Sequence, residues 1–497
     1  MKILLLSMPD CTPFFNLKRW RPPNLAMTSL ASNIEGHEVR IGDFMMNRVN
    51  IKQTVTELIN DYKPDVVGTS AMSFQFSTAK RIAALVKSLR KETITVLGGY
   101  HATLLYDELC TTDETKPFDY VIRGEGESSF AELLDALEGK RRMESVRGLS
   151  YRNGDGFKHN PHRPPEDMDR LKLPDRTKRL WKGNHFNGQI LDIIETSRGC
   201  TMPCNFCCME KMYGKSFRMY SIPRVIEDIG NCKKLGARWI IISDDNICLD
   251  IERFEGLCDA ISDAGHNDIS YIVQASCTGI ASSDKLTEKM ARAGFKIIFL
   301  GIENVAEDNL RLLKKGNIIA SSRQAVKKLH DHDMMITGGI ILGSPEDKAE
   351  AIEDNYKFLE ELDIDFYADL ILTPYPRTPI RDELLQMGLI TNKDNYRRYN
   401  TFWANVKTNY LSPDEIQFLR WKYNTLYGEN MLATRAYRRN HPLIYFLVNY
   451  ILRPLHTLRN KISNNNPTER EGYEAAMQIA EEMNSFPDLY DDNGASA

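Results

Sequence analysis

The middle of the chain contains three closely spaced cysteines, Cys200, Cys204 and Cys207, at the spacing C-x3-C-x2-C. Three thiolates at this spacing are able to wrap three corners of an iron–sulfur cube, whereas a fourth cysteine would fill it. The remaining iron keeps an open position for a small molecule, by the logic that separates open catalytic zinc sites from closed structural ones. The spacing therefore predicts a cluster that does chemistry.

A zinc site is one alternative interpretation, because Cys208 directly follows the motif and would supply the fourth ligand that zinc requires. Three cysteines that meet by coincidence in a core are the other. The remaining six of the ten cysteines are scattered, unlike the framework of a small disulfide-rich chain. The apolar run before Pro9 is too short for a signal peptide. We therefore expect a metal or redox site in a reducing cytoplasm.

The elements that position the motif begin with a predicted strand at 190–195, which directly precedes it. This strand opens an array in which strands and helices alternate. The strands are expected at 190–195, 239–243, 270–274, 296–301, 335–342 and 366–372. Six such units fit a partial (β/α)6 barrel over residues 188–390, whose active-site residues follow the strands.

Residues 1–140 alternate in the same way and predict an α/β fold, a Rossmann-like doubly wound sheet. Ligands of such sheets bind at the carboxyl ends of the strands. Candidate binding residues at these ends are Ser70, Gly98, Gly99, His101, Gly124, Glu125 and Gly126.

The rest of the chain is less informative. Residues 141–187 carry turn signals and several prolines and are interpreted as a connector. Residues 391–497 predict a mainly helical region that ends in an acidic tail. Within it, 431–468 has no acidic residue and surrounds an apolar run with basic ones. This basic segment indicates either peripheral membrane contact or a helix with a solvated basic face.

The bulk composition excludes several classes of protein. The net charge is −4 and the apolar content is that of a globular protein. No global positive field suggests a nucleic-acid partner, and no apolar run is long enough to predict a spanning helix. We expect a cytoplasmic protein, with membrane association as the alternative.

The cysteine motif resembles the signature of the radical S-adenosylmethionine (SAM) superfamily, including the aromatic Phe206 before the last cysteine. The resemblance implies that Cys200, Cys204 and Cys207 ligate a [4Fe–4S] cluster and that the free iron binds SAM. One electron then splits SAM into methionine and a 5′-deoxyadenosyl radical. Cys208 lies outside the signature, and we interpret it as a structural or neighbouring residue.

Later strand ends are similar to those of the same superfamily. By this resemblance, the loop with Asp244 and Asp245 helps to hold the amino group of SAM. Glu303 resembles the acidic residue that accepts hydrogen bonds from the ribose hydroxyls of SAM. Gly343 begins the loop that follows the fifth strand. The alternative interpretation of the paired aspartates is a structural one, in which they cap a helix or lie in a solvated turn.

The amino-terminal part resembles the cobalamin-binding domain of one branch of this superfamily. Its glycines would let the backbone approach a flat ligand, although plain turns would also use them. The familiar motif has a histidine that ligates cobalt, but the comparable segment here reads Asp43, Phe44, Met45. His101 is a candidate cobalt ligand, with capping or hydrogen bonding as the alternative.

The resemblance implies a cobalamin-dependent radical SAM enzyme that methylates an unactivated carbon of a small-molecule or lipid-like substrate. A cyclase of the anaerobic magnesium-protoporphyrin monomethyl ester type is the first alternative. A sensor of cobalamin or metal without catalysis is the alternative from another class. The chemistry implies an electron donor such as flavodoxin or ferredoxin.

Overall fold

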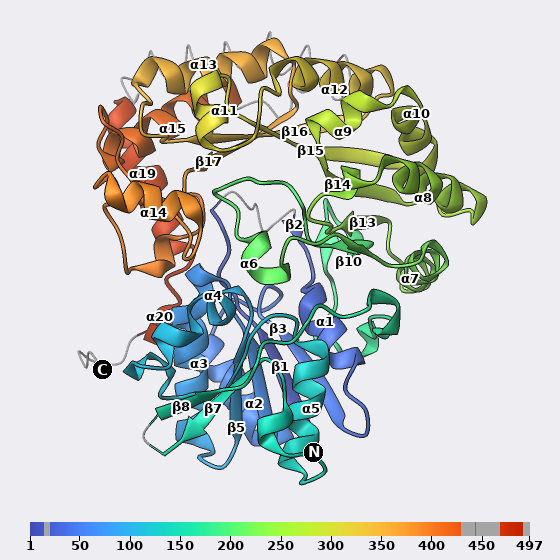
Figure 1. Ribbon diagram of the computed structural model, residues 1–497, viewed down its shortest axis with the longest axis vertical. Helices are drawn as coiled ribbons and strands as arrows, with labels where there is room; N and C mark the ends of the chain where they lie inside the picture. Colours follow the sequence, from blue (N-terminus) through green and yellow to red (C-terminus); the bar gives the residue numbers. More distant parts are fainter. Residues whose placement is uncertain (14–19, 155, 429–442, 444–467, 491–497) are drawn as a thin grey trace.

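The computed structural model describes residues 1–13, 20–154, 156–428, 443 and 468–490. Its strands form two main sheets, one mostly from the amino-terminal part of the chain and one mostly from its middle. Figure 1 shows the second sheet curling as an arc over the first, with helices of the carboxyl-terminal part along one side.

The first sheet has the strand order β3-β1-β4-β5-β6-β7-β8. Its strands are β1 (Lys2–Ser7), β3 (Glu38–Asp43), β4 (Val66–Ser70), β5 (Ile94–Gly98), β6 (Tyr120–Ile122), β7 (Leu149–Asn153) and β8 (Gly156–His159). The helices are α1 (Leu25–Ser32), α2 (Ile51–Tyr62), α3 (Phe76–Leu89), α4 (Tyr100–Leu109) and α5 (Glu127–Leu137). Strands β1, β3, β4, β5 and β6 pair in parallel.

Apolar side chains cover both faces of this sheet. Helices α2, α3 and α4 pack on one face, and α1 and α5 pack on the other. Strand β1 is a continuous apolar run because a central parallel strand is buried on both sides. The Rossmann-like doubly wound fold is thereby confirmed.

Two strands of the first sheet lie within 141–187, the stretch interpreted as a connector. Strand β7 pairs antiparallel with β6, and β8 pairs antiparallel with β7. Side chains such as Arg152 and Lys158 are exposed, so no apolar alternation marks the hairpin in the sequence. The sheet therefore extends to His159 instead of ending near residue 140.

The second sheet has the order β17-β16-β15-β14-β13-β10-β9-β2. Its parallel strands are β10 (Gln189–Ile194), β13 (Trp239–Ile242), β14 (Ser270–Ser276), β15 (Phe295–Glu303), β16 (Met335–Leu342) and β17 (Phe366–Ile371). The helices between them are α7 (Ile222–Lys234), α8 (Ile251–Asp263), α9 (Cys277–Ser282), α10 (Asp284–Ala293), α11 (Glu307–Leu312), α12 (Ile319–Asp331) and α13 (Ala349–Glu361). The sheet ends at β17 and at β2 without closing, which confirms the partial (β/α)6 barrel.

The edge beside β10 draws on distant parts of the chain. Strand β9 (His185–Phe186) pairs antiparallel with β10, and β2 (Trp20–Arg21) pairs antiparallel with β9. Residues near the amino terminus therefore contribute to the second sheet, which ties the two parts of the molecule together.

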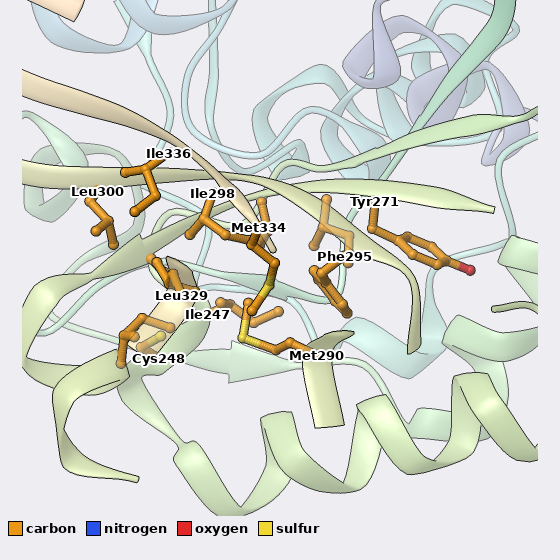
Figure 2. Close-up of a cluster of buried hydrophobic side chains, with 14 of the residues drawn as sticks. Ile247, Cys248, Tyr271, Met290, Phe295, Ile298, Leu300, Leu329, Met334 and Ile336 are labelled. Atoms are coloured by element: carbon orange, nitrogen blue, oxygen red, sulfur yellow. The ribbon is translucent and has the colours of Figure 1, made fainter. Parts of the chain in front are cut away.

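The core of the barrel lies between its sheet and the surrounding helices. Figure 2 shows Met290 of α10 and Leu329 of α12 directed toward Phe295 and Ile298 of β15. The ring centroids of Phe295 and Tyr271 lie 5.3 Å apart. Burial of such side chains stabilises the fold by about 25 cal/mol per Å² of apolar surface. This core holds the strands whose ends carry the candidate site.

The carboxyl-terminal helices are α14 (Pro379–Gln386), α15 (Pro413–Gly428), α19 (Glu469–Glu482) and α20 (Pro487–Tyr490). Helix α19 packs on α15, and α20 packs on α2 and α3. The Nδ2 of Asn484 donates to the carbonyl of Cys11 at 2.7 Å. The expectation of a mainly helical region is confirmed, and this region connects the barrel with the first sheet.

No helix among the described residues has the length and apolar character that a membrane crossing requires. The basic segment 431–468 lies outside the described residues, apart from Leu443 and Thr468.

Candidate functional site

The three cysteines lie on a loop between β11 (Ser197–Arg198) and α6 (Met209–Tyr213). Each of their side chains is half-buried. Gly199 has φ +85°, and a Cβ there would collide with the carbonyl of Ser216, so only glycine fits the turn into the motif. Figure 1 shows α6 inside the arc of the barrel, facing the first sheet.

Packing fixes the other side of this loop. The Nδ2 of Asn205 donates to the carbonyl of Leu312 at 2.8 Å, and Phe206 packs on an apolar cluster at the end of the barrel. Cys208 instead packs against the core of the first sheet. Phe206 and Cys208 therefore act as supports for the loop, and Cys208 is directed toward the amino-terminal core.

The three cysteines are not gathered around one point in the structure. Among the described residues, no three His, Cys, Asp or Glu side chains are gathered to hold one metal ion. Burial raises the pKa of Cys204, and it raises that of Cys207 to about 11. Metal binding needs thiolates and would therefore release protons.

The paired aspartates after β13 have different roles in the fold. The carboxylate of Asp244 accepts hydrogen bonds from the amide of Thr196 at 2.6 Å, from its hydroxyl at 2.5 Å, and from the hydroxyl of Ser197 at 2.6 Å. These bonds use both of its oxygens to hold the segment before the cysteines. Asp245 accepts from the amide of Gly199 at 2.8 Å and also lines a cavity. Only Asp245 is placed to contact a ligand there.

Glu303 ends β15 in an unusual backbone conformation. Its φ is +63°, a left-handed value that a side chain adopts at a cost. Its carboxylate is almost buried and lies 2.7 Å from the Nζ of Lys315. Gly343 has φ +89°, and its amide donates to Asp347. Both residues lie at strand ends of the barrel, as predicted.

A cavity of about 290 Å³ lies between the two sheets. Its floor consists of the ends of β4, β5 and β6, and its roof comes from the barrel and the cysteine loop. Predicted residues in its lining are Ser70, Gly98, Gly99, Gly124, Glu125, Gly126 and Asp245. The structure thus brings predicted residues from both halves of the chain to one site.

The floor is shaped by glycine. Gly124 has φ +75°, and a Cβ there would have no atom within 4 Å, so its surface is open. Gly99 has φ +93°, and a Cβ there would lie 2.7 Å from the hydroxyl of Ser70 and 2.8 Å from the backbone of Ala71. Gly124 therefore leaves bare backbone against which a flat group can lie, whereas the close approach of Ser70 and Ala71 requires glycine at position 99. Cobalamin is such a flat group, and hydroxyls and carboxylates in the lining suit its amide side chains.

His101 lies apart from this cavity. It is fully buried, with its ring 4.3 Å from that of Phe76 and 5.0 Å from that of Tyr396. Neither ring nitrogen has a hydrogen-bond partner among the described residues, and burial lowers its pKa to about 3. The structure places His101 in the core beside Phe76 and Tyr396, outside the described lining of the cavity.

The lining residues that were not selected from the sequence include Glu127, Glu195, Arg198 and Tyr213. Burial raises the pKa of Glu195 to about 7. Burial alone would raise the pKa of Glu127, but the charge and hydrogen bond of Arg198 bring it below its usual value. The sequence feature that could have indicated these residues is the charged pair Glu195 and Arg198, which directly precedes the cysteine motif.

Comparisons with known proteins agree with this geometry. A family model described as B12 binding domain matches residues 18–134, and one described as Radical SAM superfamily matches residues 194–359. The chain is 30% identical over 448 residues to an uncharacterized methyltransferase of Pyrococcus horikoshii, covering 89% of this chain and 96% of that protein.

Two further relatives are informative. The chain is 28% identical over 384 residues to the anaerobic magnesium-protoporphyrin IX monomethyl ester cyclase of Rubrivivax gelatinosus, covering 75% of this chain and 67% of that protein. Its fold is similar to that of the radical SAM methyltransferase TsrM from Kitasatospora setae, solved with cobalamin and a [4Fe–4S] cluster. The TM-score is 0.67 at 16% identity, and the match covers 97% of this chain and 99% of that one.

Proposed function

Because this chain belongs to the radical SAM superfamily, in the branch with an amino-terminal B12-binding domain, we propose that it methylates an unactivated carbon. The substrate would be a small or lipid-like molecule, and the cofactors would be a [4Fe–4S] cluster, SAM and cobalamin. The methyltransferase of Pyrococcus horikoshii, similar over nearly its whole length, supports methylation.

One observation carries the proposal. The cavity over the strand ends of the first sheet and the cysteine loop share a residue, Asp245, which lines the cavity and binds the amide of Gly199. A group in the cavity therefore lies beside the loop that would hold the cluster. Methyl transfer that uses both cofactors requires this proximity.

Different residues of the chain would hold the cluster and SAM. When bound, the cluster supplies the electron that splits SAM, and cobalamin carries the methyl group. Cys200, Cys204 and Cys207 would hold the cluster, and Phe206 would support their loop. Glu303 would accept hydrogen bonds from the ribose hydroxyls of SAM. The ammonium of Lys315 holds the carboxylate of Glu303 in place.

The amino-terminal floor would bind cobalamin without a histidine ligand. Gly98, Gly99, Gly124 and Gly126 leave the backbone accessible to its flat face, and Ser70 offers a hydroxyl. No histidine is present in the described lining of the cavity. The protein would therefore orient the group and exclude water from it.

A cyclase that forms a carbon–carbon bond is the second candidate, because the match to the cyclase of Rubrivivax gelatinosus covers three quarters of this chain. Both candidates need an external electron donor, for which flavodoxin or ferredoxin is the expected class.

The test is a product analysis without oxygen. The protein is purified anaerobically, supplied with iron and sulfide, and incubated with SAM, cobalamin and a reductant. Mass spectrometry then follows 5′-deoxyadenosine and S-adenosylhomocysteine. The negative control replaces Cys200, Cys204 and Cys207 by Ala, and the matched control is Cys208→Ala, which leaves the signature intact.

The two products separate the candidates. Deoxyadenosine that is lost only in the triple variant supports radical chemistry at this cluster. S-adenosylhomocysteine that requires cobalamin supports methylation, whereas deoxyadenosine alone favours the cyclase. Neither product, from a protein shown to carry its cluster, would refute the proposal and favour a sensor.

A further inference from the structure

The cysteine loop is closed at its base by a two-residue ladder. Strand β11 pairs antiparallel with β12 (Arg218–Met219), so that Arg198 stands directly opposite Arg218. The residues between them, 199–217, include the three cysteines and α6. Like charges directly opposite each other destabilise a ladder, so this base requires a compensating charge.

Glu125 supplies that charge from the other domain. Its Oε1 lies 3.0 Å from Nη1 of Arg198 and 2.8 Å from Nη2 of Arg218, and its Oε2 lies 3.2 Å from Nη1 of Arg218. The side chains of Glu125 and Arg198 are only 7% and 8% exposed. One buried carboxylate of the first domain thus bridges both arginines at the base of the loop.

The remaining nitrogens of Arg198 are also occupied. Its Nη2 lies 2.7 Å from Oε1 of Glu127, and its Nε lies 2.8 Å from Oε2 of Glu195. Each of the three guanidinium nitrogens therefore binds a different carboxylate. Because the guanidinium is planar and rigid, three such bonds define its orientation, and Cys200 follows only two residues later.

The same carboxylates form part of the cavity wall. Glu125, Glu127, Glu195 and Arg198 all line it. We propose that Glu125 and Arg198 are positioning residues, which clamp the base of the cysteine loop to the wall of the cofactor cavity. The clamp sets where the cluster lies relative to the group bound in the cavity. This inference rests on the proposed function, because it assigns the loop to the cluster and the cavity to cobalamin.

The test compares two variants of the clamp with a matched control. Glu125→Gln removes the charge and keeps the shape, and Arg198→Lys keeps the charge and loses the three-way geometry. The control is Arg377→Met. Arg377, in the loop after β17, also joins the two halves of the molecule, through bonds of 2.8 and 2.9 Å to Asp107 on α4.

Two readouts are used on the full-length protein. Hydrogen–deuterium exchange of amides 199–217 is measured with and without the cluster, and the electron paramagnetic resonance spectrum of the reduced cluster is recorded with SAM and cobalamin present. We expect Glu125→Gln to speed exchange in this segment by about tenfold or more and to change the spectrum. Arg198→Lys should also speed exchange relative to the wild type, because it keeps the charge and loses the three-way geometry, and Arg377→Met should match the wild type in both readouts.

Wild-type exchange and a wild-type spectrum in Glu125→Gln would overturn the clamp. So would an equal change in Arg377→Met, because general loosening of the two halves would then explain the effect. Exchange in the cluster-free protein does not depend on SAM cleavage. A wild-type protein that makes no deoxyadenosine would therefore refute the proposed function while the exchange comparison still decides on the clamp.

Discussion

The Nζ of Lys315 lies 2.7 Å from Oε1 of Glu303, the residue that ends β15 with a φ of +63°. Burial would lower the pKa of Lys315, but the charge of Glu303 raises it above its usual value. The ammonium is therefore a permanent partner of this carboxylate. The left-handed backbone and the buried ion pair together hold the carboxylate in one orientation at the end of the strand.

Glu303→Gln is expected to weaken SAM binding about tenfold, because one charge-assisted hydrogen bond to a hydroxyl becomes a neutral one. The affinity is measured by anaerobic titration of the cluster-loaded protein. Glu307→Gln, on the exposed surface of α11, is the control and should bind SAM like the wild type. Unchanged affinity in Glu303→Gln would remove this residue from the SAM site.

His101→Leu is expected to leave cobalamin binding unchanged and to raise the free energy of unfolding by about 1 kcal/mol. The substitution removes two buried ring nitrogens that lack partners among the described residues, and such atoms cost free energy in the folded state. Leucine has nearly the volume of histidine, so packing between Phe76 and Tyr396 is preserved. The visible spectrum of bound cobalamin and the melting temperature report the two effects. A spectrum altered by the substitution would instead identify His101 as a cobalt ligand.

The pH dependence of stability is expected to include a contribution from Glu195. Burial raises its pKa from 4.5 to about 7, with Arg198 opposing and Asp244 reinforcing the shift. A raised carboxyl pKa means that the folded state favours the protonated form, so this stability is fully present below pH 4.5. It is lost as the pH rises toward 7, and it amounts to at most about 3 kcal/mol.

Glu195→Gln should therefore flatten the fall in melting temperature of the apo-protein between pH 5 and pH 8. Asp10 has a pKa that burial also raises to about 7, so Asp10→Asn is the comparison, and the double variant should be flatter than either single one. An identical pH profile in Glu195→Gln and in the wild type would contradict the prediction.

Asp244→Asn is expected to destabilise the protein by roughly 2–4 kcal/mol, because an amide NH₂ would face donors that now bind a carboxylate oxygen. Its partners are Thr196 and Ser197, which directly precede the cysteine loop. Asp245 accepts a single side-chain bond, from the amide of Gly199, and the carbonyl oxygen of Asn can still accept it. Asp245→Asn should therefore cost about 1 kcal/mol or less. Thermal unfolding of the cluster-free proteins gives the comparison. Equal losses in the two variants would show that Asp244 has no special role in holding the loop.

Much of the fold follows from local patterns. The apolar run of β1 and the strand at Met335–Leu342 are recognisable from a few residues, because a buried strand needs a short continuous apolar segment. The hairpin of β7 and β8 was not recognisable, since its exposed polar residues carry no such pattern. Its place in the sheet depends on pairing with β6.

The fate of Tyr100 and His101 shows a limit of local reasoning. Both follow Gly99 at the end of β5, and both belong to α4. Tyr100 lines the cavity, whereas His101 is buried beside Phe76. Successive residues of a helix point about 100° apart, so the register of α4 decides which neighbour meets the ligand. Only the packing of that helix sets the register.

The sequence by itself determined the cysteine spacing, the order of strands and helices, and the glycines at the strand ends, because each depends on residues close together in the chain. The tertiary structure decided which of these ends share one cavity. It also decided that Glu125 meets Arg198 across 73 positions and that Asp244 is used within the fold. Such contacts depend on how the barrel is placed over the strand ends of the first sheet, and no local pattern of residues encodes that arrangement.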